Sequence, residues 1–329
     1  MADLLWTGND WNFDAIQRVY AACENIAVND LKLNCYPNQL EVINSTQMLD
    51  AYTSVGMPIY YKHWSFGKQF VREQKSYQSG RSGLAYELVI NSNPCINYLM
   101  EDNTMTTQAL VIAHAAFGHN HFFKNNYLFQ QWTDASGIVD YLIFARDYID
   151  KQETKHGRKA VEDWLDSCHA LMDYGVNRYK RPGKLSMEKE KARQKERSEF
   201  LQSQVSDLYR ILPKAKEREE KVKQFPAQPE ENLLYFFEKY SPDIEDWQRE
   251  ILRIVRKIAQ YFYPQGQTKV MNEGFASIVH YKIMNMLHDR GMTPDGAHLE
   301  FLALHTNVLY QPGHTSKYYS GINPYKFGF

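Results

Sequence analysis

The hydrophobic positions of the chain follow a helical period over most of its length. Residues 12–28 carry apolar side chains three and four positions apart, which predicts an amphipathic helix capped by Asn12. The same spacing predicts helices over 107–129, 134–150, 158–179, 247–262 and 270–289. The turn-forming segment YPQGQ is expected to separate the last two. The chain is therefore expected to be mainly helical.

Short extended patterns are confined to the first hundred residues. QLEVI (39–43) alternates apolar and polar positions, MPIYY (57–61) follows a glycine, and LAYELVI (84–90) ends at the turn-like NSNP. These segments predict a small N-terminal β-sheet. The expected fold class is α+β, mainly α, with a helical core.

Two interruptions divide the chain. RPGK (181–184) and PAQPEEN (226–232) enclose a segment in which residues 184–224 hold 12 Lys or Arg and 8 Asp or Glu. This pattern predicts a solvated, charged helical arm. We expect one folded unit with three parts: a mixed α/β half over 1–182, the charged arm over 183–225, and a helical half over 226–329 that ends in an aromatic tail.

Composition narrows the class of protein. The chain has 329 residues, is 43% hydrophobic and carries a formal net charge of −1, so no global field attracts nucleic acid. No window approaches the roughly 18 apolar residues of a membrane span, and the N-terminus does not read as a secretory signal. The four cysteines form no CxxC pair, which is typical of free thiols in a reducing compartment. We therefore expect a cytoplasmic protein.

Three histidines stand in the nearly apolar segment VIAHAAFGHNHFF (111–123). A buried imidazole without a partner is costly, so these side chains need a metal, a reacting group or core hydrogen bonds. His114 and His119 are five residues apart, about 140° round an ideal α-helix, and would not share a face. A one-residue π-bulge near Gly118 would make them converge, and such bulges favour functional sites.

A second candidate segment is VMNEGFASIVHY (270–281). Glu273 and His280 are seven residues apart and share a helical face, with the small residues Ala276 and Ser277 between them. His114, His119 and Glu273 together would make the His₂Glu set of a catalytic zinc site. Histidines in helical cores are also commonly satisfied by carbonyl groups or tyrosine hydroxyls, and both interpretations stay open.

Three further features are weaker candidates for a functional site. Cys95 could be a nucleophile, although a single cysteine beside a strand end is more often structural. Asp166, His169 and Asp173 share a face, which favours a core histidine oriented by a carboxylate. HWSFGKQF (63–70), with His63, Trp64 and Lys68, either lines a pocket or is a loop held by its aromatic rings.

Long, specific segments spread over the chain point to a known family. They are LLWTGNDWNF, YPNQLEVI, MLDAYTSVGMPIYYKHWSFGKQF, LAYELVINSNPCINYLMEDNTM, VIAHAAFGHNHFFKNNYLF, WTDASGIVDYLIFARDYI, LDSCHALMDYGVNRYKRP, ENLLYFFEKYSP, WQREILRIVRKIAQYFYPQ, VMNEGFA and YYSGINPYKFGF. Through these segments essentially the whole chain resembles the SpoVR family (stage V sporulation protein R). Members usually continue past the last of these segments into a further C-terminal region.

The resemblance implies a physiological setting and assigns no catalytic residues. The family name comes from the formation of the spore cortex, a peptidoglycan layer. In bacteria that do not sporulate, the family is associated with the stress response, with a serine protein kinase of AAA+ type and with a von Willebrand factor A-like protein. These are the expected partners.

A fainter similarity concerns the two zinc motifs of gluzincin metallopeptidases, H-E-x-x-H and N-E-G-x-A. IAHAAFGH and MNEGFA resemble them, which implies His114, His119 and Glu273 as ligands, with one residue inserted before His119. Ala115 occupies the place of the general-base glutamate. Glu87 and His280 are the candidates to replace it as catalytic residues.

These observations lead to three hypotheses. The first is a zincin-like site that holds zinc or another divalent metal and hydrolyses an amide, in cell-wall metabolism. The second is a non-enzymatic regulator or scaffold that binds partners through the charged arm or the aromatic tail, which the absence of the general-base glutamate favours. The third is a thiol enzyme with Cys95 as its nucleophile.

Overall fold

The structure, a computed structural model, describes residues 4–54, 57, 60–78, 87–180, 187–203, 230–317, 319 and 321–329. The chain forms two compact units. The first comprises residues 1–166 and 257–329, and the second comprises residues 167–256. The architecture is mainly helical with one small sheet, so the predicted α+β class is confirmed.

The sheet belongs to the first unit and has three strands in the order β1-β3-β2. β1 (Asn38–Ile43) pairs in parallel with β3 (Cys95–Met100), and β2 (Glu87–Ile90) pairs with β3 in antiparallel fashion. β1 confirms the strand predicted over 39–43, and β2 confirms the described part of the one predicted over 84–90. The extended segment predicted at 57–61 is wrong where it is described, since residues 57, 60 and 61 form no strand.

β3 was not predicted, because a buried polar residue interrupts its apolar alternation. Asn97 is fully buried, and its side-chain amide donates a hydrogen bond of 3.0 Å to Oδ1 of Asn38 on β1. This bond and a second one to the carbonyl of Cys95 satisfy the N–H groups of the amide, which would otherwise be costly to bury. The central strand therefore does not read as a strand from its sequence pattern.

Helices cover the sheet and build the core of the first unit. They are α1 (Phe13–Asn25) with the π-helix η1 (Ile26–Asp30), α2 (Ser45–Thr53), α3 (Trp64–Gln78), α4 (Met105–Ile112), the π-helix η2 (Ala113–His119), α5 (Asn120–Asn125), α6 (Tyr127–Trp132), α7 (Ile138–His156), α12 (Asp295–Val308) and α13 (Pro324–Gly328). Two more, α8 (Arg158–Ala170) and α11 (Asp246–Asp289), contribute residues to both units. Asn12 caps α1 as predicted, by accepting a hydrogen bond from the backbone N–H of Ala15.

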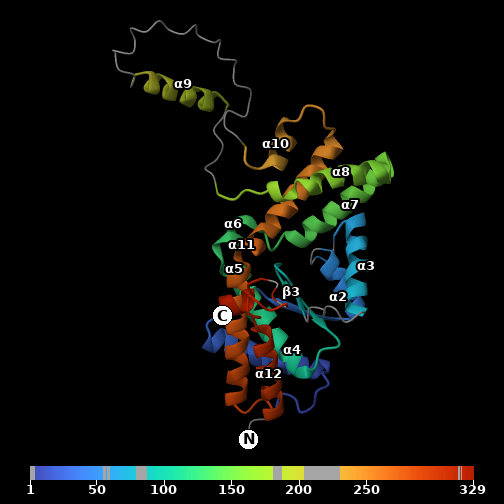
Figure 1. Cartoon of the computed structure of the whole chain (residues 1–329), viewed down its shortest axis with the longest axis vertical. Coiled ribbons are helices and arrows are strands. Elements are labelled where there is room, and N and C mark those ends of the chain that lie inside the picture. Colours follow the sequence, from blue (N-terminus) through green and yellow to red (C-terminus); the bar gives the residue numbers. More distant parts are fainter. Residues whose placement is uncertain are drawn as a thin grey trace. The chain divides into compact units, whose positions relative to one another are not determined.

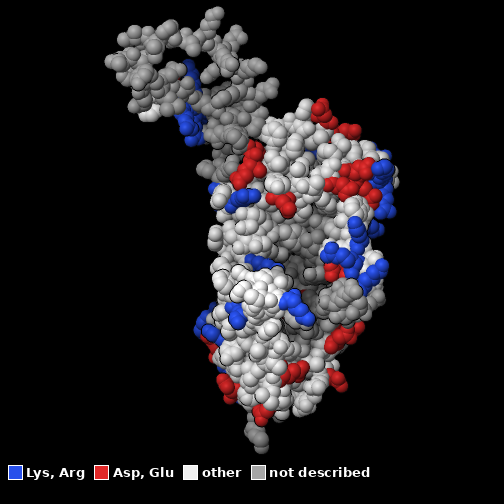
Figure 2. Space-filling view, in the orientation of Figure 1, with Lys and Arg blue, Asp and Glu red and all other residues white. Residues whose placement is uncertain are grey.

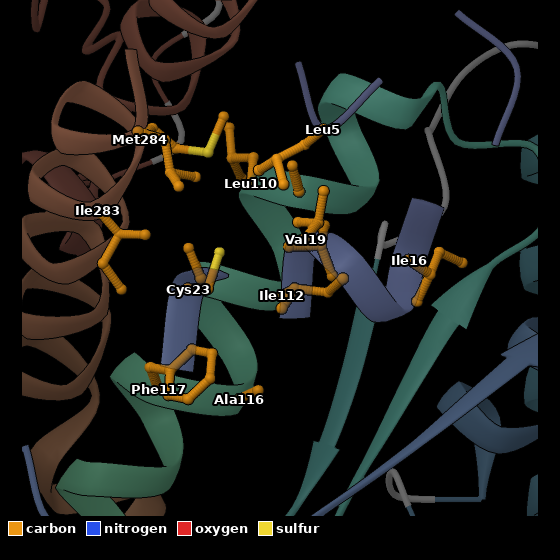
Figure 3. Close-up of a cluster of buried hydrophobic side chains, with 14 of the residues drawn as sticks. Leu5, Ile16, Val19, Cys23, Leu110, Ile112, Ala116, Phe117, Ile283 and Met284 are labelled. Atoms are coloured by element: carbon orange, nitrogen blue, oxygen red, sulfur yellow. The ribbon is translucent and has the colours of Figure 1, made fainter. Parts of the chain in front are cut away.

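The main hydrophobic core joins α1, α4 and the C-terminal half of α11. Figure 3 shows Cys23 of α1 and Phe117 of η2 on the side of Ile283 of α11, with Ile112 of α4 in the same cluster, and all four are at most 1% exposed. This packing fixes α4 and η2, which carry the histidine segment, against α11. Any change in the winding of η2 is therefore transmitted to the contact between these two helices.

α11 runs without interruption through Pro264, so the break predicted at YPQGQ is wrong (Figure 1). Proline removes one backbone donor and crowds the preceding turn, which usually kinks or ends a helix. Here the next turn is tied down by a 2.7 Å hydrogen bond from the Thr268 hydroxyl to the carbonyl of Pro264. The hydroxyl of Tyr261 also anchors the helix to the carbonyl of Asn91. The result is a single helix of 44 residues.

The second unit contains η3 (Met172–Tyr174), α9 (Met187–Ser203), α10 (Leu233–Tyr240) and the first turns of α11. α9 is the described part of the predicted charged arm, and the rest of that arm, 183–186 and 204–225, lies outside the described residues. On the face that Figure 2 shows, basic and acidic side chains are interspersed along the described surface.

A buried carboxylate organises the second unit. Glu238 of α10 is 2% exposed and lies 3.1 Å from Nε of Arg253, 2.8 Å from Nε of Arg256 and 3.0 Å from Nζ of Lys239. Burial alone would raise the pKa of Glu238, but the hydrogen bond from Lys239 and the charge of Arg256 reverse the effect and lower it. Three cations thus compensate one buried charge.

Glu238→Gln is expected to lower the free energy of unfolding by about 2 kcal/mol at pH 7, because charged hydrogen bonds are lost while the arginines stay in place. A carboxylate with a depressed folded pKa stabilises the protein above its unfolded pKa. That stabilisation disappears as pH falls below the ordinary value of 4.5, toward the lower folded value. Urea denaturation of both proteins across this range should show the difference narrowing in acid, and a constant difference would contradict the assignment.

Candidate metal centre

The winding of one helix brings two histidines together. Residues 113–119 form the π-helix η2, the local widening that convergence of the two histidines was said to need. In a π-helix the hydrogen bonds join residues five apart, so side chains at this spacing lie on one face. The rings of His114 and His119 are perpendicular, with centroids 4.6 Å apart, and both are buried.

A close approach of two helices adds the carboxylate of α11. A Cβ atom at Gly118 would lie 2.7 Å from Cα and 2.8 Å from Cβ of Ala276, closer than real atoms pack. Glycine therefore permits η2 to lie directly on α11, one turn from Glu273. Oε2 of Glu273 lies 3.9 Å from Nε2 of His114 and 3.6 Å from Nε2 of His119.

The sheet supplies a second carboxylate. Glu87 begins β2, and its Oε1 lies 3.5 Å from Nε2 of His114. Ligand atoms of Glu87, His114 and His119 all lie within 4.8 Å of one another. Glu87 from a strand thus joins the two histidines of η2 in one cluster, and Glu273 from α11 lies within 4 Å of both histidines.

The spacing of these atoms suits a shared cation better than hydrogen bonding. The separations of 3.5 to 3.9 Å exceed the normal range for N–H···O bonds. They approach the edge of a tetrahedron, about 3.4 Å, for zinc with bonds of about 2.05 Å. Among the described residues, Oε2 of Glu87 and Oε2 of Glu273 are buried without a hydrogen-bond partner. The donor set of two imidazoles and two carboxylates therefore fits zinc or a similar divalent metal.

The outer nitrogens of both histidines have partners of their own. Nδ1 of His119 lies 3.0 Å from Oδ1 of Asn272, which can only accept, so this histidine carries its proton on Nδ1. Nε2 is then left with a free lone pair toward the carboxylates. Such an outer hydrogen bond orients most metal-binding histidines.

His114 is held by a chain of histidines. Its Nδ1 lies 2.8 Å from Nδ1 of His280, and Nε2 of His280 lies 2.8 Å from Nδ1 of His305 on α12. If His114 presents a lone pair at Nε2, its proton is on Nδ1, and each histidine in turn donates to the next. Both ring nitrogens of His280 are engaged in this chain. The structure thus puts His280 behind His114 and Glu87 beside it.

The pKa values of the two carboxyl groups, Glu87 and Glu273, shift in opposite directions. Burial, reinforced by the charge of Glu273, raises the pKa of Glu87 well above its usual range. Burial also opposes ionisation of Glu273, but interactions with His114 and His119 outweigh it and lower that pKa to about 2. Burial lowers the pKa of His114 to about 4 and that of His280 well below its ordinary value. In the metal-free site, burial thus disfavours the ionised form of Glu87, whereas the two histidines favour the ionised form of Glu273.

A cavity of about 850 Å³ opens beside the four side chains. Tyr325 of α13 lines it and lies over the ring of His114 with a centroid separation of 6.2 Å. α13 reaches this position because Gly274 and Gly328 let its backbone touch α11. The aromatic tail thus forms part of the cavity wall.

Sequence reasoning missed several residues around this site. Asn272, Tyr325 and His305 had no assigned role, although Asn272 stands next to Glu273 and Tyr325 lies in a segment that carries the family resemblance. His305 lies on α12, a helix that was not predicted. A hydrogen-bond partner 25 residues further along the chain has no local sequence signal.

Other candidate residues lie elsewhere. His121 accepts a hydrogen bond from the backbone N–H of Asn34, outside the cavity. Cys95 is fully buried on β3, and burial raises the pKa of its thiol, which suits the structural interpretation. Asp166 bonds Nε1 of Trp64 and lies 3.0 Å from Nε2 of His63.

HWSFGKQF was interpreted as either a pocket lining or a loop. Its residues from Trp64 onward belong to helix α3, so the loop prediction is wrong. His63 immediately precedes the helix, where its Nδ1 lies 2.7 Å from Oγ of Ser65 in the first turn. A histidine replaces the usual short polar cap, which is why the start of this helix was not recognised.

Comparison with known proteins decides the family. The profile described as SpoVR like protein matches residues 10–329. The chain belongs to the SpoVR family. A SpoVR relative, "Uncharacterized protein YcgB" of Escherichia coli (strain K12), is 60% identical over 324 residues, which cover 98% of this chain and 63% of that protein. The chain thus spans less than two thirds of the length of this relative.

Two further findings concern the SpoVR chain. No solved structure matches it. In the part of the chain that the structure describes, no helix is both long and apolar enough to cross a membrane.

Proposed function

We propose that this SpoVR chain is a metal-dependent hydrolase that cleaves an amide bond. The observation that carries the proposal is the pair of buried histidines His114 and His119 with Glu87 on one side and Glu273 on the other, at separations that suit a shared cation. The adjoining cavity is large enough for a small organic substrate. Zinc or another divalent metal is the proposed cofactor.

The four side chains take different roles in this proposal. His114, His119 and Glu273 hold the metal, as their similarity to the gluzincin motifs implies. Glu87 carries the proton that Ala115 cannot carry, because its unpartnered Oε2 belongs to the same cluster. His280 is a positioning residue that orients His114, since both of its ring nitrogens contact other histidines.

The reaction is a hydrolysis in which all atoms are accounted for. A bound divalent metal supplies Lewis acidity to the carbonyl oxygen and to water. The positive charge of the metal would favour the carboxylate form of Glu87. In that form Glu87 accepts a proton from the attacking water, whose oxygen bonds to the carbonyl carbon. The C–N bond then breaks, and Glu87 returns the proton to the leaving nitrogen. The products are a carboxylic acid and an amine.

The metal content of the untagged protein tests this proposal. Purified without chelators, the wild type is expected to contain near-stoichiometric zinc or another divalent metal by plasma mass spectrometry. His114→Ala and Glu273→Ala should each lose it, because each removes one of three protein ligands. His121→Ala is the matched control, since it removes a neighbouring histidine outside the cavity and should keep the metal.

The same measurement distinguishes the hydrolase from the scaffold hypothesis. The scaffold hypothesis rests on Ala115 and on α9, whose described side chains are all exposed. A wild type that contains no metal, even after reloading, while all variants remain folded by circular dichroism, would sink the hydrolase and favour the scaffold. The AAA+ serine protein kinase, the von Willebrand factor A-like protein, the link to spore cortex peptidoglycan or stress and the cytoplasmic location stay predictions from the resemblance and the sequence.

A further inference from the structure

The cavity has two chemically different walls. Its apolar wall comes from the sheet and from α4, α5 and α12, and consists of Leu88, Val89, Leu110, Val111, Phe123 and Val308. Its polar wall is a column on α11 in which Gln265, Lys269 and Glu273 follow one another at intervals of four residues. Such a cavity suits a ligand that has an apolar group on one side and polar groups along the other.

Lys269 is the only lysine or arginine among the described residues that line this cavity. It lies one turn before Glu273 on the same helix face, with about 5–6 Å between their Cβ atoms. A lysine and a glutamate at this spacing often pair, but Glu273 turns toward the histidines instead. No residue that the structure describes forms an ion pair with Lys269, so its ammonium group is available to a ligand.

We propose that Lys269 binds the free carboxylate of a peptide or N-acyl amino acid, with the adjacent amide bond at the metal centre. The inference rests on the hydrolase function proposed above and specifies its substrate class. In a C-terminal residue, only the amide nitrogen and one carbon atom separate the scissile carbonyl from the carboxylate. This short separation matches two groups on neighbouring turns of one helix. The amide of Gln265, one turn further, is the second donor to the anion.

The charge of the cavity favours a carboxylate over a phosphate. A single ammonium group compensates one negative charge, whereas a doubly charged phosphate would leave an excess close to Glu273. The side chain of the C-terminal residue then faces the apolar wall. The preferred substrate therefore ends in an apolar or small residue with an unblocked carboxylate.

Two small probes separate this inference from the metal site itself. One is the monohydroxamate of succinic acid, in which the metal-binding carbonyl and the carboxylate are separated by the same number of atoms as in the substrate. The other is the same compound with its carboxylate converted to a carboxamide. Calorimetry on the zinc-loaded full chain is expected to show about tenfold tighter binding of the carboxylate probe, from one charge-assisted contact.

Variants on α11 assign the preference to one side chain. Lys269→Met should remove the preference without changing the zinc content, and Lys269→Arg should retain it. Lys282→Met is the matched control, because Lys282 is exposed on the same helix outside the cavity and should bind both probes as the wild type does.

Equal binding of the two probes by the wild type would overturn the carboxylate site and leave the metal site standing. A preference that survives in Lys269→Met would also overturn it. Failure of the zinc-loaded protein to bind either probe would overturn the hydrolase proposal and this inference together.

Discussion

Glu87→Gln is expected to reduce amide hydrolysis by about 10²- to 10⁴-fold, the usual contribution of a positioned acid or base. Glutamine keeps the size of the side chain and its place at the start of β2, but it cannot accept the proton of the attacking water. Because His114, His119 and Glu273 remain, the metal content should stay near that of the wild type. The measurement is the release of free amine from N-benzoylglycyl-phenylalanine, alongside plasma mass spectrometry.

The control for this variant is Glu41→Gln. Glu41 belongs to β1 and contacts Gln39, outside the cavity, so its loss should leave both activity and metal content unchanged. Loss of the metal together with the activity in Glu87→Gln would show that Glu87 is a ligand rather than the base. Full activity would remove Glu87 from the reaction altogether.

Gly118→Ala is expected to lower the free energy of unfolding by about 2–3 kcal/mol, as overpacking in a tight core does. The new Cβ would meet backbone and side-chain atoms of Ala276 at 2.7–2.8 Å, so η2 and α11 must separate. Since His114 and His119 lie on η2 and Glu273 lies on α11, the metal content should fall as well. Urea denaturation and plasma mass spectrometry measure the two effects.

A glycine without such a neighbour provides the comparison. Gly67 lies inside α3, and a Cβ there would meet nothing within 4 Å, so Gly67→Ala should stabilise the helix by about 0.5–1 kcal/mol. If Gly118→Ala unfolded at the wild-type urea concentration and kept its metal, the contact between η2 and α11 would not control the geometry of the site.

The features that the sequence predicted best are those that depend on residues close together along the chain. The apolar period and Asn12 predicted α1, and the spacing of His114 and His119 required the widened winding that η2 has. Phe13 shows the limit even here, since its apolar side chain fits the helical period but is 66% exposed. Periodicity identifies a helix more reliably than the orientation of its first residue.

The arrangement around the histidines could not be predicted, because it depends on contacts between distant segments. Glu87 comes from a strand, His305 from α12 and Tyr325 from α13, and no spacing along the chain relates them. Pro264 was expected to end a helix that tertiary contacts carry through. At Pro264, packing outweighs a local preference of a few kcal/mol at most.

The continuity of α11 fixes the distance between two groups of the proposed substrate site. Lys269 and Glu273 lie beyond Pro264 on the same unbroken helix, so the helical pitch fixes the distance between the group that holds the carboxylate and the metal centre. A substrate one or two bonds longer would place the wrong bond at the histidines. In the proposed reaction, selectivity for the last amide of a chain follows from the pitch of one helix.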